Sequence, residues 1–113
     1  MDSDLWAELR ETERLLGLAL QETGRRGDEM VAAKARYYSL KAKAVFELRE
    51  RGLPATLITQ VVKGLDDVNE AMSEFNRREV EYENAREARL CYKKRIDVLR
   101  EQLQREWSAA GAM

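Results

Sequence analysis

Residues 65–110 read LDDVNEAMSEFNRREVEYENAREARLCYKKRIDVLREQLQREWSAA and contain neither proline nor glycine. The residue types that most strongly disfavour helix are therefore absent from this stretch until Gly111. Apolar side chains recur in it every three or four residues, the spacing of one helix face. We predict one helix over about residues 66–108, which at 1.5 Å per residue spans roughly 60 Å. Because no small core covers that length, part of the helix needs a second helix or a second chain.

The apolar stripe of this helix predicts a packing seam, meaning the line of side chains that faces a neighbouring helix, but its spacing is irregular. Glu79 interrupts a heptad-like pattern, and the register slips between Tyr82 and Ala85. We therefore expect two seam segments. The seam residues are Leu65, Val68, Met72, Phe75 and Tyr82 in the first segment and Ala85, Ala88, Tyr92, Ile96, Leu99, Leu103 and Trp107 in the second.

Shorter helices are predicted upstream, over residues 4–23, 29–51 and 54–63. The GRRG sequence at residues 24–27 predicts a loop between the first two, because glycine often ends helices. Gly52 with Pro54 predicts a corner before the third.

Two signals mark the junction between the short helix and the long one. Gly64 is expected to cap the end of the short helix. Asp67, followed three residues later by Glu70, resembles a capping box at the start of the long helix.

Charge alternates along the chain in four blocks. Residues 1–29 carry four basic and eight acidic side chains, residues 30–62 six and two, residues 63–87 four and eight, and residues 88–113 six and three. Opposite charges attract, so residues 29–51 should lie against residues 65–87, and residues 4–23 against residues 88–107, in the same chain or a partner's. Exposed ion pairs contribute only about 0.2–1 kcal/mol each, so charge biases the register while apolar burial supplies the stability. The fold class is therefore all-α: an elongated antiparallel hairpin or coiled-coil-like bundle with one long C-terminal helix.

Composition narrows the function classes. The chain has 113 residues, which predicts a single domain, and 36% of them are charged. Histidine is absent, which removes the commonest general base and metal ligand, so we expect no cofactor, metal or catalytic residue. Cys91 is the only cysteine, and no apolar run reaches the ~20 residues of a membrane span. These features predict a cytoplasmic protein that does not bind membranes.

A helix-face interface is the leading functional hypothesis. Tryptophan and tyrosine are enriched at interface hot spots, and large apolar side chains gather on the first helix and on the distal part of the long one. The chain is expected to self-associate and to bind a further protein. The candidate interface residues are Trp6, Leu9, Leu16, Leu20, Tyr92, Ile96, Leu99, Leu103 and Trp107.

Nucleic-acid binding is the alternative. Basic side chains near aromatic ones on the C-terminal helix are typical of single-stranded nucleic-acid sites. The candidates are Arg86, Arg89, Lys93, Lys94, Arg95 and Arg100. Residues 44–63 also resemble a loose helix-turn-helix, whose second helix would present Thr56, Thr59, Gln60 and Lys63 to a groove of the duplex.

A magnesium-dependent enzyme is the third hypothesis. Glu47, Glu50, Asp67 and Glu70 could converge in a hairpin, and all-α nucleoside-triphosphate pyrophosphohydrolases hold Mg²⁺ with comparable spaced acidic motifs. Solvated helix surface explains the same spacing, because acidic residues are abundant in this chain.

The run ARYYSLKAKAVFELRERGLPATLITQVVKG, with EYENAREA and VLREQLQREW further on, resembles small helical proteins of bacteriophages and prophages of Gram-positive bacteria. The resemblance covers about residues 33–107. It implies a bacterial cytoplasm and a viral accessory role, for example in DNA recombination or in countering host defence, and it transfers no catalytic residue.

Overall fold

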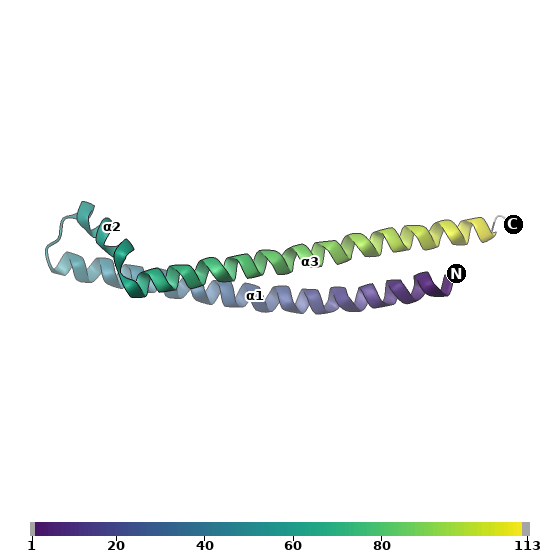
Figure 1. The fold of residues 1–113 in the computed structure, drawn as a ribbon, viewed down its shortest axis with the longest axis horizontal. Helices are drawn as coiled ribbons and strands as arrows, with labels where there is room; N and C mark the ends of the chain where they lie inside the picture. The colour runs from purple at the N-terminus through teal and green to yellow at the C-terminus, as the bar shows by residue number, and fades with distance from the viewer. Residues whose placement is uncertain (1, 112–113) are drawn as a thin grey trace. The chain divides into compact units, whose positions relative to one another are not determined.

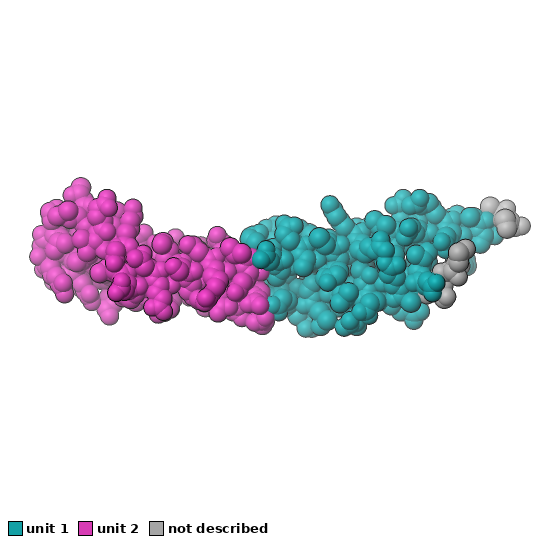
Figure 2. Space-filling view, in the orientation of Figure 1, with its two compact units in different colours: residues 1–24, 83–113 teal, residues 25–82 magenta. Residues whose placement is uncertain are grey.

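The protein consists of three helices, seen in a computed structural model that describes residues 2–111. Helix α1 is Asp2–Glu50, α2 is Ala55–Gly64 and α3 is Asp66–Gly111 (Figure 1). No strand occurs among residues 2–111. The prediction of an all-α helical hairpin with one long C-terminal helix is therefore confirmed. The chain divides into two compact units, which Figure 2 shows in different colours. Unit 1 contains residues 1–24 and 83–113, and unit 2 contains residues 25–82.

Helix α1 runs through residues 24–27 without interruption, so the predicted GRRG loop is wrong. Buried and half-buried positions alternate at spacings of four and three residues through this stretch, because Thr23 and Arg26 continue the seam. Each glycine costs roughly 1 kcal/mol relative to alanine inside a helix, which tertiary packing can override. The seam positions of α1 are Leu5, Leu9, Thr12, Leu16, Ala19, Thr23, Arg26, Met30, Ala33, Tyr37, Leu40 and Ala44.

The seam of α3 is likewise unbroken, and the predicted slip between Tyr82 and Ala85 is wrong. Spacings of three and four residues alternate along the whole helix. Sequence inspection placed the slip there because Arg78 and Arg89, two of the seam positions, are charged and were not recognised as part of the stripe. The buried or half-buried positions are Val68, Ala71, Phe75, Arg78, Tyr82, Ala85, Arg89, Tyr92, Ile96, Leu99, Leu103 and Glu106.

The corner between α1 and α2 depends on Gly52. Its φ of +81° lies in the left-handed region, which glycine adopts without a steric penalty. The Gly52 amide donates to the Arg49 carbonyl (2.9 Å) and the Leu53 amide to the Leu48 carbonyl (3.2 Å), the pattern of a Schellman motif. Pro54 then begins the next helix, and its carbonyl accepts hydrogen bonds from two amides of α2.

The junction between α2 and α3 differs from the prediction. Leu65, which has an extended backbone, follows α2 as its cap, and Gly64 is the last helical residue. The φ angle of Gly64 is not positive, so Gly64 does not act as a left-handed helix cap. Helix α3 begins at Asp66, so Asp67 already lies in the first turn and accepts a hydrogen bond from the Val68 amide (2.8 Å). A capping box starting at Asp67 is therefore not formed, because the helix begins one residue earlier.

In unit 1 the first half of α1 packs against the second half of α3. Leu9, Ile96 and Leu99 form a buried cluster, and Leu5, Leu16 and Leu103 pack around it. Carboxylates of Glu8 and Glu13 pair with Arg95 and Arg100 across the two helices. The predicted pairing of residues 4–23 with residues 88–107 therefore forms, and it forms within one chain.

In unit 2 the second half of α1, α2 and the first half of α3 share a core. Ala44 and Leu48 of α1 contact Ile58 and Val62 of α2 and Val68 of α3. The Ala44 side chain is small, which leaves room for α2 to reach this cluster. The predicted pairing of residues 29–51 with residues 65–87 is thus formed by apolar packing.

Cross-helix ion pairs in unit 2 lie at the other end of its hairpin. Arg26 pairs with Glu81 (2.8 Å) and Arg78 pairs with Glu29 (2.8 Å), so each helix contributes one seam arginine and one flanking glutamate. In contrast, no basic side chain of residues 30–62 has a carboxylate within 4.0 Å in the part of the chain that the structure describes. The positive block therefore lacks the acidic partners expected for it.

Over residues 2–111, none of the helices combines the length and the apolar character needed to cross a bilayer.

Candidate functional site

Most of the candidate interface residues lie in the core of unit 1. Leu99 is fully buried (0% exposed), and Leu9 and Ile96 are nearly so. Leu16 and Leu103 pack against them, while Tyr92 is half-buried. The distal seam predicted from sequence is thus covered by α1 of the same chain, which leaves little of it for a partner.

Three candidates remain exposed: Trp6 (50%), Leu20 and Trp107 (80%). Trp6 and Trp107, together with Leu103 and Gln104, line a hollow of about 240 Å³ in unit 1. This hollow is apolar and open to solvent, and the ends of α1 and α3 that form it lie next to each other in Figure 1.

The candidate nucleic-acid residues are partly neutralised. Arg95 and Arg100 pair with acidic residues of α1, and Arg86 lies 4.0 Å from Glu83. Arg89 occupies a seam position, where its Nε atom is buried with no hydrogen-bond partner in the described structure. Lys93 and Lys94 are exposed. The six side chains therefore do not present a continuous free cationic face.

The acidic motifs do not converge. Among the described residues, no group of three or more carboxylates or thiols is placed to hold a metal ion. Glu47, Glu50, Asp67 and Glu70 are all exposed, and the structure supports the solvated-surface interpretation of their spacing.

Unit 2 contains a groove that is formed by all three helices. Its cavity volume is about 560 Å³, within the range of 300–1,000 Å³ common for ligand pockets. The walls come from one face of each helix. They are Tyr37, Lys41, Val45 and Arg49 of α1, Ala55, Ile58, Thr59, Val62 and Lys63 of α2, and Val68, Asn69 and Met72 of α3. We call this surface the three-helix groove.

The floor of the three-helix groove is apolar and belongs to the core. Ile58, Val62 and Val68 are buried members of the unit 2 cluster, and Val45 packs against it. Because these side chains are held by the core on one side, the groove has a preformed wall. Met72, at its margin, is exposed.

The charge around the three-helix groove has one sign. Lys41, Arg49 and Lys63 line it, and no lining residue is acidic. None of these three cations has a carboxylate within 4.0 Å among residues 2–111. The Lys41 ammonium instead lies 5.8 Å from the centroid of the Tyr37 ring, which is within the range of cation–π attraction. All charged side chains that line the groove are therefore basic, and they stand over an apolar floor.

A shallower hollow adjoins the groove on α1. Tyr38, Ala42 and Phe46 line it together with Lys41, Val45 and Arg49, which also line the groove. Tyr38 is 52% exposed and Phe46 is 64% exposed. Exposed aromatic side chains clustered in this way mark binding surfaces more often than isolated ones do.

Sequence inspection found only part of this site. Val31, Tyr38, Val45 and Phe46 widen the apolar stripe of residues 29–51, which indicates that this segment meets more than one neighbour. The loose helix-turn-helix pattern picked out Thr59 and Lys63, which the structure places on the groove wall. The groove itself was missed, because it depends on how α2 lies against the other two helices.

Comparison with protein-family models, with curated proteins and with solved structures finds no match to this chain, so the candidate site rests on its own geometry.

Proposed function

We propose that this protein is a non-enzymatic binding protein that captures a helical segment of a protein partner in the three-helix groove. The observation that carries the proposal is a preformed apolar floor, made by Ile58, Val62 and Val68, left open between three helices. Amphipathic helices commonly dock in such grooves through residues spaced three or four apart.

The length of the groove along α1 matches that of a short helix. Its α1 wall extends from Tyr37 to Arg49, a rise of about 18 Å at 1.5 Å per residue. A partner helix of about twelve residues has the same length. The exposed aromatic rings of Tyr38 and Phe46 extend the apolar surface beside the groove, and aromatic residues are frequent interface hot spots.

Nucleic-acid binding by the C-terminal basic face has less support. Arg95 and Arg100 already pair with Glu8 and Glu13, and phosphate binding would have to displace those carboxylates. A gel-shift titration at low salt tests this alternative, and a salt-sensitive shift lost on replacing Lys93 and Lys94 would favour it.

The setting we propose is a bacterial cytoplasm, with the protein serving as a phage-type accessory factor. This part rests on the resemblance of residues 33–107 to small phage proteins. The partner would then be a host or phage protein.

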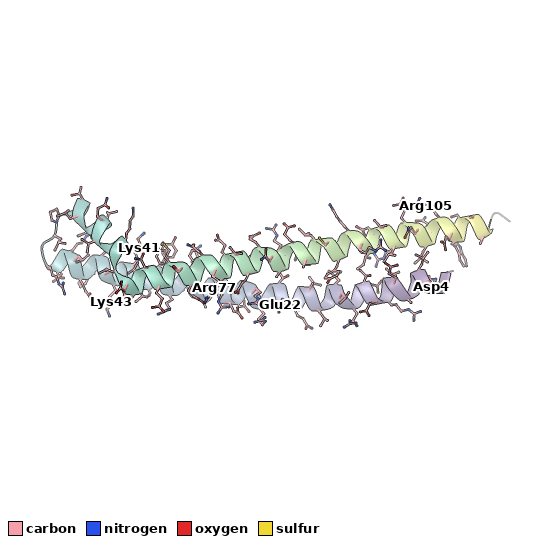
Figure 3. The ribbon with its side chains drawn as sticks, in the orientation of Figure 1. Asp4, Glu22, Lys41, Lys43, Arg77 and Arg105 are labelled. Carbon is pink, nitrogen blue, oxygen red and sulfur yellow. The ribbon has the colours of Figure 1, made fainter. Side chains whose placement is uncertain are left out.

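Site-specific photocrosslinking tests the proposed function. A photoreactive phenylalanine analogue replaces Thr59, an exposed groove residue. The control position is Lys43, which lies on α1 about 200° around the helix from Lys41, at 100° per residue. Figure 3 labels Lys41 and Lys43 on different sides of the ribbon. We expect a discrete protein adduct from position 59 and none from position 43. Equal labelling at both positions, or none at either, would contradict the proposal.

A further inference from the structure

We infer that the segment bound in the three-helix groove is an acidic amphipathic helix whose carboxylates lie seven or eight residues apart. This inference rests on the proposed function, because it specifies the chemistry of the helix that the groove takes. It follows from the uncompensated cations at the rim.

The first step concerns charge. Lys41, Arg49 and Lys63 surround an apolar floor, and no acidic side chain lines the groove. Two cations beside the packed seam have carboxylate neighbours across it: Arg95 has Glu8, and Arg78 has Glu29. A partner that covers the groove buries part of the three cationic side chains, and desolvated cations need anionic partners. A helix that covers the apolar floor and also pairs with the cations at the rim carries apolar residues on one face and carboxylates beside them.

The second step concerns spacing. Lys41 and Arg49 are eight residues apart on one straight wall, a rise of about 12 Å. On a partner helix, residues seven or eight apart span about 10–12 Å and stay near one face. Lys63 approaches from α2, on the opposite wall, and is available for a third carboxylate or for the carboxyl-terminal end of the bound helix, which carries partial negative charge.

The third step distinguishes an external partner from a second copy of this chain. The acidic block at residues 63–87 has its apolar seam residues already buried or half-buried within the chain, as Val68, Phe75 and Tyr82 are. Val80 is the large apolar side chain that stays most exposed there. This block of a second copy therefore offers the groove carboxylates without the apolar stripe that its floor requires. The other acidic block, residues 1–29, exposes Trp6, Leu18 and Leu20, and a second copy bound through it is an outcome that the test below separates from an external partner.

Three helical peptides of eighteen residues provide the test. They share one leucine stripe, with flanking positions seven residues apart filled by glutamate, by lysine or by glutamine. Each peptide carries a fluorophore, and its anisotropy on titration with the full-length protein reports binding, because an eighteen-residue peptide tumbles much faster than its complex with a 113-residue protein. We expect the glutamate peptide to bind about tenfold more tightly than the glutamine peptide, from two or three partly exposed ion pairs, and the lysine peptide to bind least.

Charge-reversal variants give the matched control. The double variant Lys41→Glu/Arg49→Glu changes two groove cations. Arg36→Glu/Lys43→Glu makes the same change in net charge on the opposite face of the same helix. We expect the first variant to reverse the order of the three peptides and the second to preserve it.

The outcomes separate the two proposals. Equal affinities for all three peptides, abolished by Met72→Asp at an exposed groove position, would uphold a helix-binding groove and overturn the inference about charge. No binding by any peptide would overturn both. Light scattering shows whether the protein dimerises as its concentration rises. If dimerisation displaces the bound peptide, the groove takes an acidic segment of a second copy, and the proposal of an external partner is overturned. Saturation by dodecanoate without any peptide binding would likewise overturn the helix in favour of an anionic amphiphile.

Discussion

Units 1 and 2 differ in how the apolar face of α3 is covered. In unit 1 two helices meet along a narrow seam filled by leucine and isoleucine, and the cations Arg95 and Arg100 face carboxylates across it. In unit 2 a third helix joins the core, and the cations Lys41 and Arg49 are left around an open groove. The comparison teaches that a charge block is paired within the fold where the seam brings it an opposite block, and stays exposed around a concave surface where the chain supplies none.

The largest expected effect is in the seam of unit 1. Leu99→Ala removes a side chain with no exposed surface, so it should lower the free energy of unfolding by about 2–5 kcal/mol. Val98→Ala, one residue along and exposed, is the control and should change stability by less than about 1 kcal/mol. Chemical denaturation followed by circular dichroism measures both. Equal effects would mean that α1 does not cover the distal half of α3.

The second-largest effect on stability is expected from a substitution in the corner between α1 and α2. Gly52→Ala places a Cβ at a φ of +81°, which costs about 1–2 kcal/mol. The same denaturation experiment measures the loss. Gly64→Ala is a suitable comparison, because Gly64 is helical, has no positive φ and has open space around it. A neutral Gly52→Ala variant would show that the corner adopts another conformation.

The helical conformation of residues 24–27 predicts a gain in stability on replacing glycine there. If residues 24–27 are helical, Gly24→Ala should stabilise the protein by about 0.5–1 kcal/mol, because a Cβ there meets no atom within 4 Å. Gly27→Ala should gain less, since its Cβ would lie 3.3 Å from the Tyr82 ring. Destabilisation by Gly24→Ala would instead restore the loop predicted from the GRRG sequence.

Ion pairs across the seam of unit 2 should contribute less. A double-mutant cycle on Arg26→Gln and Glu81→Gln is expected to give a coupling energy of about 0.2–1 kcal/mol, because both side chains remain partly exposed. Added salt should weaken the coupling. A cycle on Glu8 and Arg95 makes the equivalent measurement in unit 1, where both partners are more exposed, and should give the smaller value.

The smallest expected effect is the loss, in acid, of the contribution that the Glu74 carboxylate makes to the stability of the fold. The hydrogen bond from Arg78 lowers the pKa of Glu74 below its usual value, and the charges of Arg77 and Arg78 act in the same direction. A carboxyl whose pKa is lower in the folded chain than in the unfolded chain stabilises the fold above the unfolded pKa, about 4.3. That contribution is lost as pH falls through the folded value. Glu74→Gln should flatten this part of the stability profile, which chemical denaturation at a series of pH values measures. An unchanged profile in this variant would contradict the prediction.

The sequence was sufficient for those features that depend on local preference and on periodicity. The absence of proline and glycine from residues 65–110 predicted α3, and Gly52 with Pro54 predicted the corner. Complementary charge predicted the pairing of residues 4–23 with residues 88–107, which unit 1 contains. Each of these features needs only a helix propensity, a turn conformation or a matched stripe.

Only the tertiary structure decided three further matters. Helix α1 continues through Gly24 and Gly27 because Thr23 and Arg26 occupy seam positions, and a polar residue at a seam looks like a break until its partners are known. The seam of α3 keeps its register through Arg78 for the same reason. The three-helix groove depends on the direction in which α2 leaves Gly52 and on which face of α1 it covers. Neither is encoded in any single stretch of sequence, because both follow from contacts between residues far apart in the chain.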